Sequence, residues 1–469
     1  MKRRILEMGL IVIILLGASA FATIRNGYGA EQPLRAQHAL GVQRILVLAV
    51  SFPKIPPGKG LSQIREDVLK NTAEYYAQVS YGKTTLTGDV KGWYKLPLPL
   101  SEYRVPPENT NLFRERHRVL QLLEDALNEA EKDVVFKQYD HIIIVPGVNS
   151  RPGVGYGAPC LAANPGVLTG GQRGRARMVT ITTRGGQQFN GGIIVIPQNA
   201  HYGHTVHDLA HAMGGVVGGN RVIPCLYDTR LQGKVGPLTN ESIPKFSIFM
   251  GPWDVMSRHV FTGKLPPPSM SSWTRLRMGW IGDDQVAEVR PSDNRAVTIQ
   301  PLSGGEGTLI VRIPGPGNTY YLLENRQKLP DDLMRPTNGL LVLHVDDSRE
   351  SWEGIVRVVN ANPRVPDFRD ARFGVGPGQT SSVNLLHDIA IEVLWQHNMD
   401  LTIVVTNKSI APEIQSVAKR IREIDQRLTI LPESRASVQA KADLTNIKEL
   451  LLQMKVGDAR AKMENIKWP

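Results

Sequence analysis

The first half of the chain alternates between continuous apolar runs and segments in which apolar residues recur every three or four positions. Apolar runs rich in branched side chains, which predict buried strands, lie at 44–53, 139–147 and 190–198. Helical spacing over 62–79 and 114–135 predicts two amphipathic helices, and 80–97 alternates like an antiparallel pair of strands. Because strands and helices follow one another in turn over 40–215, we expect an α/β (α+β) domain with a mixed central sheet.

The second half of the chain changes its pattern twice. Short apolar runs separated by Gly, Pro, Asn and Asp over 285–407 are typical of a β-sandwich. Over 408–469 apolar residues again recur every three or four positions, with a break at a proline, which predicts a helical hairpin or short coiled coil. These helices either pack against their own chain or self-associate with a second copy. The first domain then covers 40–284, and its glycine-rich segment 147–192 predicts a mobile loop or lid.

The composition is that of an ordinary globular protein with a basic surface. The 469 residues are 41% hydrophobic and 21% charged, and the formal net charge is +11. The lysines and arginines are spread along the chain, and no dense basic run carries interleaved aromatic residues. We therefore expect a protein that binds no nucleic acid.

The first residues have the pattern of a secretory signal peptide. A basic start at 1–4 precedes an apolar stretch of about 15 residues at 8–22, which ends in small residues. This stretch is short for a membrane span of about 20 residues. The pattern predicts a signal peptide at 1–22 and a secreted, extracellular chain with no stable membrane insertion after cleavage. An uncleaved membrane anchor is the alternative.

The most informative stretch for chemistry is HTVHDLAHAMGG at 204–215. His207 and His211 are four residues apart, and on a helix such residues lie on one face with Cβ atoms about 5–6 Å apart. Two imidazoles at this spacing can converge on one zinc ion. His204 lies on the same face but about 10 Å from His211 along the helix, so it cannot share that ion.

Cys160 and Cys225 are the two cysteines of the chain. In an exported protein a single pair of cysteines predicts a disulfide. The competing interpretation is that Cys225 is a metal ligand.

Several further motifs occur in the order found in one family. AEYYAQVSYGKTTLTGDVKGWYKLP and YDHIIIVP precede the histidines, and PCLYDTR, GPWDVMS, SSWTRLRMGWI, YYLLENRQ and GLLVLHVDD follow them. Over roughly 42–405 these segments resemble the secreted metallopeptidases of the immune inhibitor A type, a metzincin-like group of zinc peptidases. The resemblance implies a metzincin-like peptidase domain, a zinc cofactor and hydrolysis of peptide bonds in a protein or peptide substrate.

The resemblance also implies roles for individual residues. His207 and His211 would bind zinc, and Gly214 would be the glycine of the following turn. Met256, in WDVMS, would be the methionine of the turn beneath the zinc, and Asp228 the last residue of the family's Leu-Tyr-Asp motif. The family would also allow calcium to bind at the carboxylates of Glu324, Asp346 and Asp347. The alternative is that these carboxylates have a structural role at the ends of strands.

Two departures from the family motif decide the chemistry. Asp208 stands where the family has its general-base glutamate, and its carboxylate is shorter by one C–C step, about 1.5 Å. The third zinc ligand is expected ten residues after His207, where Val217 cannot coordinate a metal. Alignment of IPCLYD with the family motif instead puts Cys225 in the ligand position, after an insertion of about eight residues, GVVGGNRV.

Three arrangements are therefore open for the third ligand. Cys225 could bind the metal as a thiolate, which gives a His-His-Cys site with one open position. Asp228 or another carboxylate could bind instead. A disulfide between Cys160 and Cys225 would leave two histidines and weak metal binding. The chain is thus expected to be either a weak zinc metalloendopeptidase or a catalytically impaired pseudopeptidase that binds peptides or surface partners outside the cell.

Overall fold

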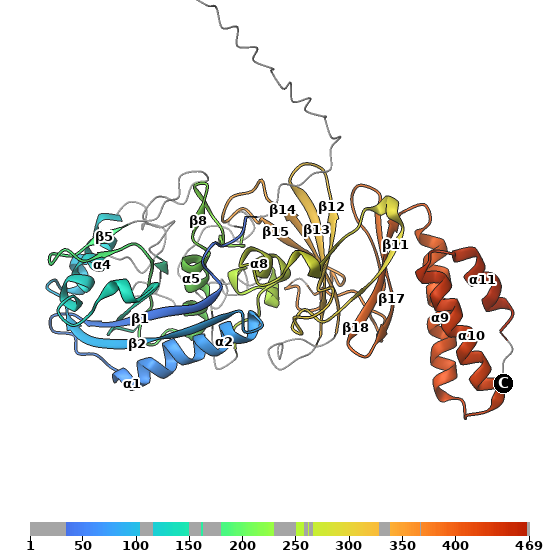
Figure 1. The fold of residues 1–469 in the computed structure, drawn as a ribbon, viewed down its shortest axis with the longest axis horizontal. Helices are drawn as coiled ribbons and strands as arrows, with labels where there is room; N and C mark the ends of the chain where they lie inside the picture. Colours follow the sequence, from blue (N-terminus) through green and yellow to red (C-terminus); the bar gives the residue numbers. More distant parts are fainter. Residues whose placement is uncertain are drawn as a thin grey trace, which may run out of the picture.

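The computed structural model describes residues 34–103, 116–149, 161–162, 180–228, 250–257, 261, 266–327, 338–365 and 367–466. Figure 1 shows an α/β part, a part built of two sheets and a group of helices, which follow one another along the long axis of the molecule. The predicted signal peptide at 1–22 lies outside the described residues. Among the helices in the described ranges, none combines the length and the apolar composition that crossing a membrane requires.

The α/β part is built on a five-stranded sheet with the order β2-β1-β3-β7-β4. Its strands are β1 (Gly41–Ser51), β2 (Thr84–Lys95), β3 (His141–Pro146), β4 (Leu161–Ala162) and β7 (Gly192–Val195). Strands β2, β1, β3 and β7 are parallel, and β4 pairs antiparallel with β7 at the edge. The predicted mixed sheet is confirmed. The antiparallel pair predicted at 80–97 is wrong, because these residues form one long strand that pairs with β1 in parallel.

Helices cover both faces of this sheet (Figure 1). Successive side chains of β1 point to opposite faces, so Ile45 and Val47 share a core with the helices that precede β2, whereas Leu46 and Leu48 share one with α4 (Arg116–Ala130). Burial on both faces explains the continuous apolar run of this strand. The helix predicted at 62–79 is present as three consecutive segments, which are α1 (Leu61–Ile64), the π-helix η1 (Arg65–Lys70) and α2 (Asn71–Val79).

Short elements complete this part of the chain. They are α3 (Leu100–Tyr103), η3 (Phe136–Gln138), β5 (Ile181–Thr182), β6 (Gln188–Phe189), α5 (Tyr202–Gly214), β8 (Val216–Val217), β9 (Asn220–Arg221), η5 (Gly251–Trp253), η6 (Val255–Ser257), α8 (Ser272–Arg277) and η7 (Asp283–Gln285). Most of the glycine-rich segment 147–192, predicted as a loop or lid, falls outside the described ranges.

The next part of the chain forms two sheets that share a core. The first has the order β10 (Val286–Glu288), β12 (Ile310–Pro314), β13 (Thr319–Arg326), β14 (Gly339–Asp346) and β15 (Val356–Val359). The second has the order β11 (Arg295–Ile299), β18 (Asp400–Asn407), β17 (Ile389–His397) and β16 (Ser382–Asn384), and η8 (Pro291–Asp293) precedes β11. Leu323 and Val342 of the first sheet belong to the same buried cluster as Ile391 and Ile403 of the second. The two sheets therefore pack face to face as a β-sandwich.

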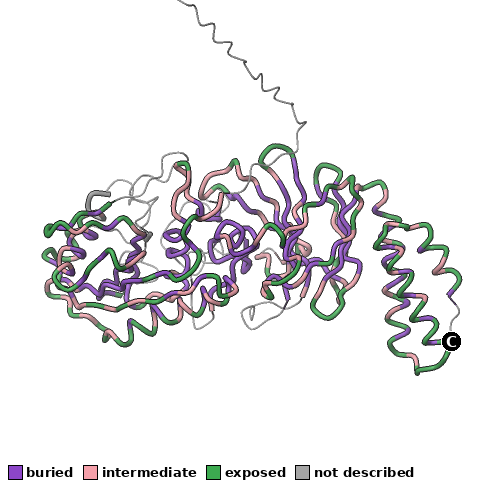
Figure 2. The backbone as a smooth tube through the Cα atoms, viewed as in Figure 1, coloured by how far each residue is buried: buried purple, intermediate pink, exposed green. Residues whose placement is uncertain are grey.

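The C-terminal region is helical, as predicted, but has three helices rather than two. They are α9 (Ala411–Ile430), α10 (Arg435–Leu452) and α11 (Val456–Glu464). Ile421 and Ile447 of these helices share a buried cluster with Leu394 and Val404 on the outer face of the four-stranded sheet. Figure 2 shows buried residues in the interior of all three parts of the molecule. The helices thus pack against their own chain, and association with a second copy stays a prediction.

Candidate metal centre

Helix α5, which carries the two histidines, is buried along most of its length. It begins after His201, whose Nδ1 accepts a hydrogen bond from Gly203 N at 3.0 Å. It ends at Gly215, whose φ of 64° lies in the left-handed region that favours glycine. Gly214, the predicted turn glycine, has a different role. A Cβ at this position would lie 2.6 Å from Ile223 Cγ1, so glycine here permits close packing against the returning chain.

His207, His211 and Cys225 bring three ligand atoms together. Nε2 of His207 lies 3.1 Å from Nε2 of His211, and Cys225 Sγ lies 3.8 Å from the first nitrogen and 3.3 Å from the second. The three atoms are within 4.8 Å of one another, and each residue is at most 4% exposed. Within the described ranges, this is the one group of three or more His, Cys, Asp or Glu residues that could hold a metal ion.

Backbone carbonyls orient both imidazole rings. His207 Nδ1 lies 3.0 Å from Val255 O, and His211 Nδ1 lies 2.6 Å from Ile223 O. Because a carbonyl oxygen can only accept, each Nδ1 must donate its hydrogen, and each Nε2 keeps its lone pair directed into the cluster. Histidines that bind metals in proteins are held by the same kind of hydrogen bond.

Burial and neighbouring charges set the protonation of this cluster. Burial lowers the pKa of His207 to about 4, so this ring is neutral at physiological pH. The two Nε2 atoms lie 3.1 Å apart, an arrangement that a metal ion bound to both nitrogens would satisfy. Burial raises the pKa of the Cys225 thiol, and the charge of Arg221 and hydrogen bonds from the Tyr227 and Trp352 side chains oppose this effect. The donor set therefore fits a metal that accepts imidazole and thiolate ligands.

Two charged residues, Asp208 and Arg221, lie beside the cluster. Asp208 follows His207 in helix α5 and is 7% exposed. Arg221 stands in β9, and its Nε and Nη2 have no hydrogen-bond partner among the residues described. Burial lowers the pKa of Arg221, and the nearby Cys225, Asp208 and Tyr227 oppose this shift. Sequence reasoning missed Arg221, whose one signal is that it belongs to the inserted segment GVVGGNRV.

The other predicted site residues lie near the cluster but do not belong to it. Asp228 is 1% exposed and accepts a hydrogen bond from Arg357 Nη2 at 3.0 Å, so its carboxylate is engaged in an ion pair. Met256 is fully buried in the short helix η6, next to the carbonyl that orients His207. His204 packs its ring against Phe261.

Cys225 is a free cysteine in the structure, which differs from the predicted disulfide. Its sulfur is directed toward the two histidine Nε2 atoms instead. Cys160, the other half of that prediction, lies outside the described residues. Three arrangements were considered for the third ligand. The described residues contain the arrangement in which the cysteine sulfur lies beside the histidines.

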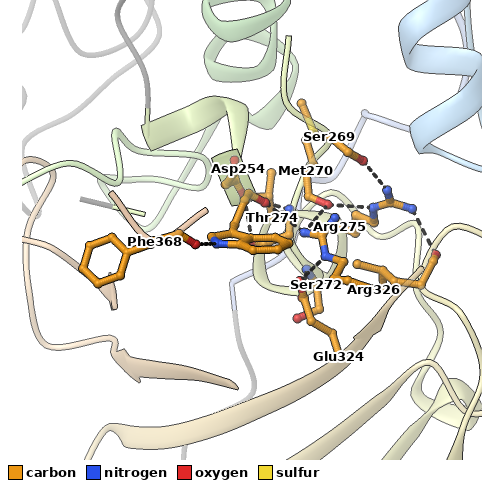
Figure 3. Close-up of polar contacts among 12 residues, drawn as sticks. Asp254, Ser269, Met270, Ser272, Thr274, Arg275, Glu324, Arg326 and Phe368 are labelled. Carbon is orange, nitrogen blue, oxygen red and sulfur yellow. Dashed lines mark hydrogen bonds and ion pairs between the residues drawn. The ribbon is translucent and has the colours of Figure 1, made fainter. Parts of the chain in front are cut away.

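A buried polar network lies beneath the turn that orients His207 (Figure 3). Its centre is Asp254, which is 0% exposed. The groups that donate to its carboxylate, at 2.5–2.9 Å, are Met256 N, Ser271 N, Ser271 Oγ and Thr274 Oγ1. Burial raises the pKa of this carboxyl group, and these hydrogen bonds oppose the shift. Because Val255 lies between Asp254 and Met256, the network holds the carbonyl group that orients His207.

The same network extends into the β-sandwich through β13 (Figure 3). Arg326 Nη2 donates to Trp253 O at 2.8 Å, and Arg326 Nε donates to Glu324 at 2.5 Å. Glu324 also accepts from Ser272 N at 2.6 Å. Charged groups of β13 therefore join the β-sandwich to Trp253 and Ser272, on either side of the turn that orients His207.

The three carboxylates for which calcium was an expectation all have protein partners. The ion pairs, at 2.5, 2.9 and 2.8 Å, are Glu324–Arg326, Asp346–Arg349 and Asp347–Arg277. These contacts are consistent with the structural role that was the alternative, and calcium binding stays a prediction.

Fold and site together define a mixed α/β protein with several sheets, a helical C-terminal region and a buried His-His-Cys group that could hold a metal ion. A comparison with protein-family models finds no match, and a comparison with curated proteins finds none either. The resemblance to the immune inhibitor A type therefore rests on the sequence motifs alone.

Proposed function

We propose that this chain is a divergent, exported zinc peptidase that hydrolyses peptide bonds. The observation that carries the proposal is the buried convergence of His207 Nε2, His211 Nε2 and Cys225 Sγ within 4.8 Å. Two imidazoles and a thiolate form a ligand set typical of zinc, and three protein ligands leave one position of a tetrahedral site open. The resemblance to the immune inhibitor A type supports a protein or peptide as the substrate, and the mixed sheet beside helix α5 supports a metzincin-like domain.

A zinc ion held by these residues would supply Lewis acidity at the scissile carbonyl and lower the pKa of water. The residues of the chain would hold the ion and move protons. The carbonyl groups of Val255 and Ile223 keep both Nε2 atoms directed into the cluster. Asp208, next to His207, would accept a proton from the attacking water. Arg221 would provide positive charge near a substrate oxygen that becomes negative in the transition state.

The length of Asp208 favours a second candidate function. Its carboxylate lies about 1.5 Å closer to the backbone than that of a glutamate. A general base must come within about 2.6–3.2 Å of the proton that it removes. If the chain binds the metal but its Asp208 carboxylate does not come this close to the water, the protein would bind peptides or surface partners outside the cell without cleaving them.

Metal content tests the ligand assignment. We expect the purified chain to hold about one zinc ion, and His207→Ala and His211→Ala each to lose it, because two ligands bind zinc weakly. His204→Ala is the matched control, since His204 lies in the same helix but outside the cluster. Zinc that persists in both ligand variants, or that is lost in the control, contradicts the assignment.

Variants of Asp208 distinguish the two candidate functions. For a peptidase, casein cleavage should be sensitive to a chelator, faster in Asp208→Glu and abolished in Asp208→Asn, with the zinc content unchanged. Zinc-loaded wild-type and Asp208→Glu proteins that both fail to cleave casein would instead support the peptide-binding alternative.

A further inference from the structure

The connection between β14 and β15 of the β-sandwich reaches the candidate metal centre. Cys225 N donates a hydrogen bond to Ser351 Oγ at 3.1 Å, and Trp352 N donates to Cys225 O at 3.4 Å. Asp228 forms an antiparallel bridge with Glu353. Both backbone polar groups of Cys225 are therefore bonded to this connection, and they determine the direction in which its side chain leaves the backbone.

Trp352 also contacts the sulfur of Cys225. The side chains of Tyr227 and Trp352 donate hydrogen bonds to this sulfur. Their rings stack on one another, with centroids 6.1 Å apart and an interplanar angle of 21°. The sulfur held in this way lies 3.3 Å from His211 Nε2. In metalloproteins, metal affinity depends on the groups that orient a ligand atom and form hydrogen bonds with it.

The backbone of Trp352 has an unusual conformation for a residue with a side chain. Its φ of 74° lies in the left-handed region, which residues with a Cβ rarely adopt and glycine adopts readily. If the chain needed only a turn here, glycine would be more stable. Residues held in such conformations concentrate at functional sites, and in this case the indole lies against the sulfur of Cys225.

We infer that residues 351–353 belong to the metal centre and that Trp352 is a positioning residue for the ligand Cys225. This inference rests on the metal site of the proposed function. The β-sandwich supports the site at two points. It holds Cys225 through Ser351 and Trp352, and through Arg326 it holds the turn that orients His207 (Figure 3).

Cobalt(II) binding to the full-length chain tests the inference. Cobalt is the probe because its thiolate complexes absorb in the near ultraviolet, so the spectrum reports the bond to Cys225 separately from the affinity. Trp352→Phe keeps an aromatic ring but removes the N–H group, and Trp352→Gly removes the ring while it relieves the backbone. We expect both variants to bind cobalt about 10- to 100-fold more weakly and to show an altered thiolate band. Trp395→Phe, in β17 and outside the cluster, should match the wild-type protein.

A second pair of variants covers the case in which a Trp352 variant does not fold. Ser351→Ala removes the hydroxyl group that accepts from Cys225 N and should weaken cobalt binding, whereas Ser351→Thr keeps a hydroxyl group and should restore it. If Trp352 and Ser351 variants retain wild-type affinity and a wild-type thiolate band, the inference is wrong although the metal site stands. If the wild-type chain binds no cobalt, or if His211→Ala binds it equally well, the proposed metal site fails and the inference fails with it.

Discussion

Asp254→Asn is expected to weaken both the fold and the candidate metal centre. The carboxylate of Asp254 accepts one hydrogen bond at Oδ1, from Met256 N, and three at Oδ2, from Ser271 N, Ser271 Oγ and Thr274 Oγ1. An asparagine has one acceptor oxygen, which serves best in the Oδ2 position. Its NH2 group would then face Met256 N–H, and two donors would oppose each other in a fully buried turn.

The expected loss follows from these contacts. One hydrogen bond to a charged group disappears and leaves a buried N–H unsatisfied, and the other three bonds become weaker because the acceptor is neutral. Together these effects correspond to about 3 kcal/mol. At about 2–4 °C per kcal/mol for a domain of this size, the thermal midpoint should fall by roughly 6–12 °C. Displacement of the adjacent Val255 carbonyl, which orients His207, should also lower metal affinity by about 10- to 100-fold.

Thermal unfolding followed by circular dichroism, and zinc affinity measured by competition with a chelator, would check both effects. The matched control is Asp284→Asn, the same substitution at an exposed position, which should change stability by no more than about 0.5 kcal/mol. If Asp254→Asn unfolds within about 2 °C of the control, which corresponds to no more than about 1 kcal/mol, and binds zinc equally well, the network does not support the site.

Three further predictions concern the fold. Burial lowers the pKa of His141 from 6.5 to about 4, so the unfolded chain takes up a proton at this site more readily. The contribution of neutral His141 to the free energy of unfolding is therefore complete above about pH 6.5. It falls by roughly 3 kcal/mol between about pH 6.5 and pH 4. His141→Gln should remove this part of the pH dependence in urea titrations and the exposed His38→Gln should not. Ile421→Ala, in a fully buried position of α9, should cost about 2–5 kcal/mol in the unfolding of the C-terminal helices, and an unchanged urea midpoint would contradict their packing on the sheet. Gly88→Ala should cost about 3 kcal/mol, because its Cβ would lie 1.8 Å from Ile45 O, whereas Gly457→Ala, with open space around it in α11, should stabilise the chain by about 0.5–1 kcal/mol; equal thermal midpoints for the two variants would refute this reasoning.

Sequence patterns predicted the central strands well because burial on both faces produces an unbroken apolar run. Strands β1 and β3 are of this kind. Strand β2 has an exposed or half-exposed side chain at most positions, so its residues alternate, and Gly88 and Gly92 suggest a turn between two strands. In fact Gly88 lies in the middle of one strand, where the backbone of Ile45 approaches too closely for any side chain. Close backbone approach from another strand leaves no signal besides the glycine itself.

The candidate site was predictable where it depends on local spacing, and the family motif placed Cys225 in the ligand position. His207 and His211 could be paired because four residues on a helix fix their relative positions. The carbonyl groups of Val255 and Ile223 act through the backbone, which side-chain identity does not reveal. Trp352 lies 127 residues from Cys225 along the chain, and this contact requires the sheet that contains β14 and β15 to pack against the α/β part.

The position of Cys225 follows from the path of the chain after helix α5. The inserted segment GVVGGNRV, residues 215–222, folds back on itself as the hairpin β8–β9, and Val222 N donates to Gly215 O at 3.1 Å at its base. The hairpin therefore leaves and returns at the same place, and Ile223 resumes the chain beneath His211, whose ring it orients. Cys225 comes two residues later, beside both histidines, although it is eighteen residues from His207 in sequence. A closed hairpin of this kind lengthens the spacing between ligands along the sequence without moving the ligands apart in space. The same insertion places Arg221 next to the cluster.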